Sequence, residues 1–496
     1  MKSTLIALVL GMLCLVSNGT CQTTSPSPNS STESYHPNFP RLGLIAIAYD
    51  QNYEPYNWPT YARFNVVIIG GNWEIWPEGA GITWSREDVV KGIKTDSRIG
   101  TKVFQYVHYD GVNATGAAAS GDDPNDPNNF FAALNRNNWW LYENGTSGAT
   151  VPNGYNNQTV VNMTHFSPRD SATGLRPYEF AAAYSKGMYY SGNALQPRNA
   201  APSLDGFFLD NAYWSPRVNG DWNRDGVTDF DTDPAVQKAV RTGERDFPDE
   251  MSKLAPHLLV ITNNADWPQA STTDPNAIAP LDGAFSGGVL EGIIGESYSI
   301  ETYAGFNTAM AGYQYVMDTT KAPQLELFNQ ELLQPDGSDN YDSTPYHAMR
   351  YGLCMALMNN GYYAGEGQYS HTAEPSQIPW FDEYDGGGLG AGYLGQPVNG
   401  PLGAVQTHAR WNYGPYGVWA REFQGGIAIL NPKGNGPQTI TLQDLGGFRW
   451  KHINGSQDPE TNNGQNVTGS ITLADRDGII LLRRGYQLPR NTNGSR

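Results

Sequence analysis

Short apolar runs recur along the first three quarters of the chain, and longer stretches of mixed polarity separate them. Polar or aromatic residues close each run, which is the pattern expected of buried strands that alternate with helices. We expect eight strands, at residues 42–50, 64–71, 102–111, 205–214, 257–267, 287–293, 324–331 and 361–368. Helical periodicity occurs between several of them, at residues 85–94, 177–190 and 346–358.

The number of these strand–helix units predicts the fold class. Eight units within residues 41–370 match an α/β fold, the (β/α)8 TIM barrel with inserted loops. The alternative is an open, doubly wound sheet, but no glycine-rich phosphate-binding turn follows the first strand. A long segment rich in Asn, Gly, Asp and Pro, residues 113–170, follows the third strand. Because loops at that end of a barrel build the active-site face, we expect this segment to wall a cleft.

A different pattern follows the predicted barrel. After a connecting segment, residues 371–414, short alternating strands punctuated by Gly, Asn and Pro occur within residues 415–486. These strands are expected at residues 417–423, 426–431, 438–442 and 478–483. The pattern predicts a C-terminal all-β sandwich, and we expect this domain to brace the barrel rather than to bind a ligand.

The N-terminal residues predict export. Residues 1–21 contain Lys2, an apolar stretch over residues 5–16 and small polar residues up to Cys21, which is the pattern of a secretory signal peptide. Residues 22–40 are rich in Ser, Thr and Pro and are expected to be a disordered linker. Cys21 as a lipid-modified first residue is the alternative, although the residues before it match a lipid-attachment motif poorly. No other stretch is apolar for long enough to span a membrane.

Charge and cysteine content narrow the classes of partner. The chain has 31 Lys and Arg against 49 Asp and Glu, a net charge of −18, which disfavours nucleic acid and anionic membranes and suits a neutral substrate. Only three cysteines occur, and Cys14 lies in the signal peptide, so no disulfide framework is expected. This scarcity favours a bacterial extracellular or envelope protein, with Cys354 as a small buried apolar residue. The 13 Trp and 29 Tyr suit sugar recognition, although a large core also uses them.

One carboxylate stands out as a candidate catalytic group. Barrel enzymes carry their catalytic residues at the C-terminal ends of strands, and Asp210 ends the fourth apolar run. Strand alternation places it on one face with Gly206 and Phe208. Asp205 begins the same run and is therefore at the wrong end. The alternative for Asp210 is a structural role, as a helix cap or a hydrogen-bonded loop carboxylate.

Glycosidic cleavage requires a second carboxyl group, because one group protonates the leaving oxygen while the other attacks the sugar or activates water. Glu291 is the first candidate, since it closes the sixth run with the same strand parity. Glu296, which lies one loop further along, and Glu331, at the end of the seventh run, remain open as alternatives.

Other strand ends carry groups that can hydrogen-bond sugar hydroxyls or stack on sugar rings. Each of these residues alone also fits a core or loop role, and their repeated position after strands is what indicates a carbohydrate cleft. The candidate substrate-binding residues are Asp50, His108, Tyr109, Asp110, Asn211, Tyr213, Trp214, Asn263 and Glu366, with Asn264, Trp267 and Gln368 in similar positions.

A separate segment, residues 221–229, resembles a calcium-binding loop, because oxygen ligands occur at alternating positions around a glycine turn. Its candidate ligands are Asp221, Asn223, Asp225, Val227 and Asp229. Position twelve is Thr232 instead of the usual glutamate, although Asp231 or Asp233 can substitute. We expect a structural calcium ion that stiffens the loop after the fourth strand; the alternative is a solvated acidic turn.

With these residues in view, the chain resembles a group of TIM-barrel glycoside hydrolases that is distantly similar to endo-α-1,4-polygalactosaminidases. The resemblance spans most of residues 41–485 and is carried by residues 205–211, residues 291–298, and the tail motifs at residues 421–426 and 430–432. In that group an Asp on strand four and a Glu on strand six form the catalytic pair, which the resemblance transfers to Asp210 and Glu291.

The chain departs from this pattern at one point. A Glu-Ser-aromatic motif directly ends the sixth strand in that group, whereas here Gly292 follows Glu291 and the Glu-Ser-Tyr unit begins at Glu296. Glu296 therefore stays open as the second carboxyl group. The resemblance does not transfer a substrate, because groups of this kind act on many sugars.

These observations predict a secreted O-glycosidase that acts on a poly- or oligosaccharide, with Asp210 as nucleophile or base and Glu291 as general acid. Whether it retains or inverts the anomeric configuration depends on the separation of the two carboxyl groups. The alternatives are a non-catalytic carbohydrate-binding protein, in which the two carboxylates need not converge, and an envelope structural or adhesion protein without a deep acidic cleft. No zinc-protease, phosphate-loop or serine-hydrolase motif occurs.

Overall fold

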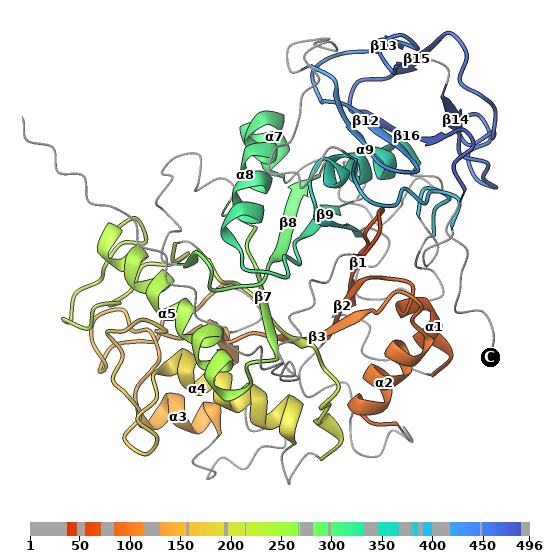
Figure 1. Ribbon diagram of the computed structural model, residues 1–496. Coiled ribbons are helices and arrows are strands. Elements are labelled where there is room, and N and C mark those ends of the chain that lie inside the picture. Colours follow the sequence, from red (N-terminus) through yellow and green to blue (C-terminus); the bar gives the residue numbers. More distant parts are fainter. Residues whose placement is uncertain are drawn as a thin grey trace, which may run out of the picture. The chain divides into compact units, whose positions relative to one another are not determined.

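Eight parallel strands form one sheet, in the order β1-β2-β3-β6-β7-β8-β9-β10. Figure 1 shows β1, β2 and β3 of this sheet side by side. A parallel bridge between Leu42 and Tyr363 joins the first strand to the last, and the Tyr363 amide donates to the Arg41 carbonyl at 2.8 Å. The sheet thus closes into the predicted barrel, and all eight predicted strands are confirmed. Their bounds are β1 Gly43–Ala46, β2 Val66–Ile69, β3 Lys102–Val107, β6 Gly206–Leu209, β7 Leu259–Asn263, β8 Gly288–Ile294, β9 Leu327–Glu331 and β10 Tyr362–Glu366.

The computed structural model describes most of the chain from residue 37 onward. The described residues are 37–46, 55–70, 84–113, 129–154, 158–192, 197–213, 215–265, 267, 281–295, 299–331, 346–366, 378, 380–384, 390–398, 417–446 and 449–487. The predicted signal peptide and most of the predicted linker lie outside them. Among the described residues, no helix combines the length and the apolar character that a membrane span requires.

Both faces of the barrel strands are buried, as parallel strands under a helical layer require. In β6, Phe207 and Leu209 join the hydrophobic core that also contains Phe247 and Met251 of the surrounding helices. The alternate residues, Gly206 and Phe208, face the other side of the sheet and are buried as well. This double burial explains why the strands appear in the sequence as continuous apolar runs.

Helices cover the outside of the barrel, and three of them match the predicted segments. Ser85 begins α2 with a reciprocal capping box to Asp88. Helix α4 passes into a π-helical turn, Lys186–Ser191, which ends one residue beyond the predicted span. The α-helices are α1 Trp58–Tyr61, α2 Arg86–Asp96, α3 Phe130–Arg136, α4 Pro177–Ser185, α5 Pro234–Leu254, α7 Ile300–Ala304, α8 Phe306–Thr319 and α9 Tyr346–Leu357, and short 3-10 turns are Pro55–Asn57 and Pro197–Asn199.

Helix α5, of 21 residues, was not predicted, because Gly243 and Pro248 lie inside it. The glycine has a tertiary reason: a Cβ at Gly243 would lie 2.1 Å from the main-chain oxygen of Met163. The helix can therefore approach the insertion after the third strand only because this position has no side chain.

That insertion forms a small structure of its own beside the barrel. Strands β4, Gly111–Asn113, and β5, Gln158–Val160, pair in antiparallel fashion, and α3 lies between them in the chain. The Asp221 amide donates to the Tyr142 carbonyl at 2.7 Å, and the Asn162 side chain donates to the Trp222 carbonyl at 2.9 Å. The insertion and the loop after β6 are thus joined into one wall.

The C-terminal residues form two antiparallel sheets, a four-stranded one in the order β11-β12-β16-β14 and a two-stranded one of β13 and β15. They share a separate core that includes Trp450, Ile440 and Leu481, so the predicted β-sandwich is confirmed. The bounds are β11 Trp419–Glu422, β12 Gly426–Asn431, β13 Gln438–Thr441, β14 Trp450–His452, β15 Ser470–Leu473 and β16 Asp477–Arg483.

Strands β12 and β16 pack on α9, where Cys354 is fully buried as predicted. A buried ion pair adds to this contact: the Arg476 guanidinium lies 3.1 Å from the Glu301 carboxylate of α7, which also accepts a hydrogen bond from Tyr351. The Arg421 guanidinium donates to the Leu357 carbonyl at 2.8 Å. These polar contacts are of the kind that a bracing domain makes, and residues 36–496 form one compact unit.

We predict that the Arg476→Met variant is destabilised by about 3–5 kcal/mol, because the Glu301 carboxylate then stays buried without its cation. Thermal unfolding measures this change. Arg98→Met, which removes an exposed arginine of the barrel, is the control and should leave the melting temperature nearly unchanged. Adding Glu301→Gln to Arg476→Met should restore much of the loss; no restoration would contradict the assigned role of the pair.

Candidate active site

Asp210 is the first residue after β6, at the C-terminal end of the barrel. Its amide donates to the Val107 carbonyl at 2.9 Å, so the strand pairing with β3 continues up to this residue. Its carboxylate accepts three hydrogen bonds, from the Tyr106 hydroxyl at 2.6 Å, the Asn263 side-chain amide at 3.0 Å and the Asn211 main-chain amide at 2.9 Å. Asp210 therefore projects into the barrel mouth between β3 and β7, as its strand parity predicts.

Glu291 occupies the start of a bulge in β8. Regular pairing with β9 runs as far as Leu290, opposite Phe328, and resumes only at Ile294, opposite Gln330. Gly292 within the bulge has a φ of 63°, and its amide donates to the Asn329 side chain at 3.2 Å. Bulges of this kind re-aim side chains next to active sites. The strand thus continues to Ile294, beyond the predicted end, while its regular part stops just before Glu291.

One amide group connects the two carboxylates. The Asn263 Nδ2 atom, at the end of β7, donates to Asp210 Oδ1 at 3.0 Å and to Glu291 Oε2 at 2.6 Å. The two acceptor oxygens are therefore no farther apart than the sum of these distances, about 5.6 Å. The structure brings together Asp210, Glu291 and Asn263, which the sequence placed on three separate strands.

The surroundings of Glu291 raise the pKa of its carboxyl group. Burial and the neighbouring charge of Asp210 raise its pKa, and the contacts with Asn263 and Arg217 offset only part of this rise. Part of the Glu291 side chain is exposed to solvent, but protein atoms surround most of it. Their burial of the carboxyl group is the largest cause of its raised pKa. Burial and the charge of Asp210 also raise the pKa of Tyr106, so its hydroxyl keeps the proton that it donates to Asp210.

A second polar cluster lies beside the pair. His108 and Asp110 form an ion pair, and the Asn211 amide nitrogen lies 2.9 Å from His108 Nε2. Burial acts to lower the pKa of His108, but the carboxylates of Asp110 and Asp210 outweigh it and raise the pKa to about 9. Asn211 has a left-handed backbone, with a φ of 60°, and its side chain accepts a hydrogen bond from Tyr213. Backbone conformations of this kind gather at functional sites.

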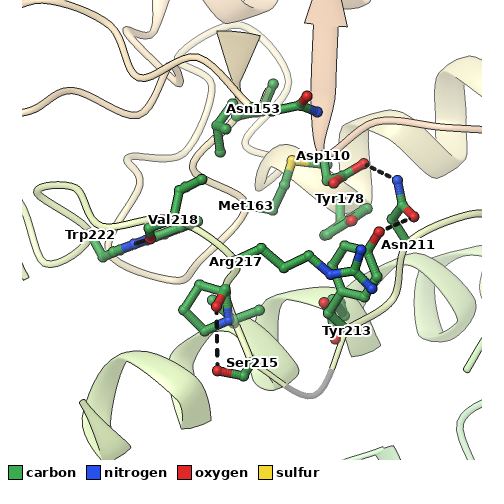
Figure 2. Close-up of a pocket in the computed structure, with 15 residues that line it drawn as sticks. Asp110, Asn153, Met163, Tyr178, Asn211, Tyr213, Ser215, Arg217, Val218 and Trp222 are labelled. Atoms are coloured by element: carbon green, nitrogen blue, oxygen red, sulfur yellow. Dashed lines mark hydrogen bonds between the residues drawn. The ribbon is translucent and has the colours of Figure 1, made fainter. Parts of the chain in front are cut away.

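A hollow opens from this cluster (Figure 2). The insertion and the loop after β6 supply most of its lining, which is largely apolar and carries a few polar groups. In Figure 2, Trp222 and Val218 lie on one side of the hollow and Asn211 and Tyr213 on the other. The lining residues are Asp110, Asn153, Val160, Val161, Met163, Tyr178, Asn211, Tyr213, Ser215, Pro216, Arg217, Val218, Trp222, Val240 and Glu244.

Some predicted site residues lie elsewhere. Tyr109 belongs to the aromatic core: its hydroxyl lies 2.7 Å from Ser185 Oγ, and its ring centroid is 4.9 Å from that of Phe130. Strand alternation explains this correction, because Tyr109 lies between His108 and Asp110 and takes the opposite face. Asn264 and Trp267 are also buried, with hydrogen bonds to Glu326 and to the Ala212 carbonyl.

Other predicted residues fall outside the described part of the chain: Asp50, Trp214, Glu296 and Gln368. The backbones of Glu331 and Glu366 end β9 and β10 and pair with one another, but their side chains lie outside the described residues. Glu296 and Glu331 therefore stay open as alternatives.

Tyr106 and Arg217 belong to the site but were not predicted from the sequence. Tyr106 shares a strand face with Phe104 and His108, so the alternation along β3 was the available signal. Arg217 had no such signal, since it lies in the irregular loop after β6, where its guanidinium carbon stacks 3.4 Å from the centroid of the Tyr213 ring.

The described residues contain no group of three or more His, Cys, Asp or Glu side chains arranged to hold a metal ion. The predicted calcium ligands do lie in one loop beside the hollow, with Trp222 between the first two of them.

No protein-family model matches the chain, and no curated protein matches it. Comparison with solved structures finds remote likenesses to carbohydrate-active enzymes. Amy13B of Eubacterium rectale is 9% identical with a TM-score of 0.45, over 93% of this chain and 100% of that chain. The GH27 β-L-arabinopyranosidase of Geobacillus stearothermophilus is 10% identical with a TM-score of 0.44, over 91% and 98%.

The glycoside hydrolase domain of PelA from Pseudomonas aeruginosa is 13% identical with a TM-score of 0.33, over 66% of this chain and 95% of that chain. At these identities and TM-scores, the likenesses assign neither a family nor an activity to the chain. The resemblance to polygalactosaminidases therefore stays a prediction.

We predict that His108 makes stability depend on pH. Its pKa in the folded state, about 9, exceeds the ordinary value of 6.5, so its contribution is fully present below pH 6.5 and is lost as the pH rises through 9. The shift corresponds to roughly 3 kcal/mol. The stability difference between the wild type and His108→Gln should shrink between these pH values in thermal unfolding. His347→Gln, at a largely exposed histidine, is the control; a pH-independent difference at His108 would refute the prediction.

Proposed function

We propose that the chain is a secreted glycoside hydrolase that cleaves O-glycosidic bonds of a poly- or oligosaccharide. The observation that carries the proposal is the Asn263 amide, which contacts Asp210 and Glu291 at once at the C-terminal end of the barrel. Two carboxyl groups facing one point are the minimum equipment for glycosidic cleavage. Export rests on the predicted signal peptide, which lies outside the described residues.

The environments of the two carboxyl groups suit opposite roles. Glu291 has a raised pKa, because it is enclosed by protein and lies near the charge of Asp210, so it can hold a proton for the leaving oxygen. Asp210 accepts three hydrogen bonds, from Tyr106, Asn263 and the Asn211 main chain, and these bonds fix the position of its carboxylate. We therefore assign Glu291 as general acid and Asp210 as nucleophile.

The short separation favours retention of the anomeric configuration. Retaining enzymes hold their carboxyl groups about 5–5.5 Å apart, whereas inverting enzymes leave about 6.5–9.5 Å for a water molecule. The acceptor oxygens of Asp210 and Glu291 lie no more than about 5.6 Å apart, which fits the spacing in retaining enzymes. In the first step Asp210 bonds to the anomeric carbon, while the leaving oxygen takes the proton of Glu291. In the second step Glu291 takes a proton from water, whose oxygen displaces Asp210.

A binding protein without catalysis would not need this arrangement. Holding two acidic groups against one another costs electrostatic repulsion, and a lectin-like site can recognise hydroxyl groups with separate polar residues. The negative charge of the chain, −18, also suits a substrate that carries no negative charge of its own. The proposal therefore places catalysis ahead of simple binding.

The test is a product screen of the purified protein on a panel of polysaccharides and oligosaccharides that includes galactosamine-containing polymers. Asp210→Asn and Glu291→Gln should each lower turnover by about 10²–10⁴-fold or more while the folded state is retained. NMR of the first-formed product should show the anomeric configuration of the substrate.

Asp205→Asn is the matched control, because it changes an acid at the opposite end of the same strand, where Asp205 pairs with Lys94 and Lys102. This variant should keep its activity per folded molecule. Full activity in Asp210→Asn or Glu291→Gln would remove that residue from the mechanism. Sugar binding without product release would support the carbohydrate-binding alternative instead.

A further inference from the structure

The loop after β6 folds its acidic side chains back over its own main chain. Asp221 Oδ2 accepts from the Gly226 amide at 3.0 Å, and Asp225 Oδ1 accepts from the Val227 amide at 2.9 Å. Asn223 Oδ1 accepts from the Asp225 amide at 2.9 Å. Gly226, with a φ of 90°, makes the turn that this arrangement requires.

The first carboxylate of the loop is buried and only half satisfied. Asp221 is 3% exposed, and its Oδ1 atom has no hydrogen-bond partner, although its Oδ2 atom is directed across the loop to Gly226. A buried carboxylate oxygen without a partner is costly, because it has lost its water and gained nothing in return. An orphaned polar atom of this kind needs an explanation, and a bound ion is one that fits a loop of oxygen ligands. A merely solvated acidic turn would leave this oxygen in water.

We infer that this loop binds one calcium ion, which supplies the missing partner of Asp221. Its protein ligands are oxygens at every second position, from the side chains of Asp221, Asn223, Asp225 and Asp229 and from the main chain of Val227. A set of carboxylate, amide and main-chain oxygens suits calcium, which accepts six to eight oxygen ligands in flexible geometry. Asp233, an alternative to the usual glutamate, instead caps α5, where its Oδ1 atom accepts from the Ala235 amide at 2.7 Å.

Binding requires a small rearrangement at one end of the loop. Both Asp229 oxygens accept hydrogen bonds from Asn223, one from its amide side chain at 2.9 Å and one from its main chain at 3.0 Å. The acids of the loop do not yet converge on one point, in keeping with the absence of a ready three-residue cluster in the described residues. Asp229 therefore exchanges its contact with the Asn223 side chain for the ion.

The position of the ion gives it a structural role beside the active site. Trp222, between the first two ligands, is 5% exposed, lines the hollow and donates to the Val218 carbonyl at 3.1 Å. The loop also holds the insertion, because the Thr228 hydroxyl donates to the Glu143 carbonyl at 2.7 Å. An ion at this point fixes the wall of the hollow, while the chemistry stays with the two carboxyl groups. The inference does not depend on the proposed hydrolase activity.

The experiment uses the full chain, freed of metal with a chelator and then titrated with calcium chloride in a calorimeter and in thermal unfolding. We expect one site per chain and a rise in melting temperature, since an ion that binds only the folded state stabilises it. Magnesium should give a much smaller response, because it demands a tighter octahedral shell. Asp221→Asn should weaken calcium affinity by at least about tenfold, because affinity follows the charge count of the ligands.

The control variant is Asp96→Asn, which removes the same charge from an exposed acid at the end of α2 and should titrate like the wild type. In the chelator, Asp221→Asn should be at least as stable as the wild type, because the orphaned charge is gone. Calcium should reverse that order. Equal calcium binding by the wild type and Asp221→Asn, no binding by the wild type, or a loss of stability in Asp221→Asn that is the same with and without calcium would each overturn the inference.

Discussion

The hydrogen bonds from one asparagine to two carboxyl groups set the conditions for the rest of the site. Two carboxylates within about 5.6 Å repel one another, and a neutral donor between them offsets part of that repulsion. The remaining repulsion is removed when one of the two carboxyl groups keeps a proton. Burial and the charge of Asp210 raise the pKa of Glu291, and the proposed division of the pair into an acid and a base rests on this difference.

This contact holds only if three separate strands end at the same height. The parallel register of β6 and β7 places Leu209 beside Thr262, so the residues that follow, Asp210 and Asn263, also meet. Glu291 reaches the same place because the regular pairing of β8 with β9 is interrupted by a bulge that begins at this residue. On the outside of the barrel, the helices pack against the strands, and the ion pair between Arg476 and Glu301 stabilises the contact of α7 with the C-terminal domain.

The sequence predicted what local alternation controls. Strand runs, helix starts and the position of Asp210 all follow from residues within a few places of one another. The bulge at Glu291 depends on the pairing of β8 with β9, and the glycine inside α5 is required because the Met163 main chain lies close to it. Both features depend on distant residues, so neither was predictable from spacing alone. The positions of Tyr106 and Tyr109 were predictable, because residues of odd and even number along one strand face opposite sides. Tyr106 therefore faces Asp210, whereas Tyr109 faces the core.

The most direct test of the coupled pair is the titration of the Glu291 carboxyl group, observed by carbon NMR in protein with labelled glutamate and assigned with Glu291→Gln. In the wild type its pKa should lie above the ordinary value of 4.5, and in Asp210→Asn it should fall while staying raised by burial. A pKa for Glu291 that is the same in both proteins would contradict the account, because the two carboxyl groups would then not act on one another.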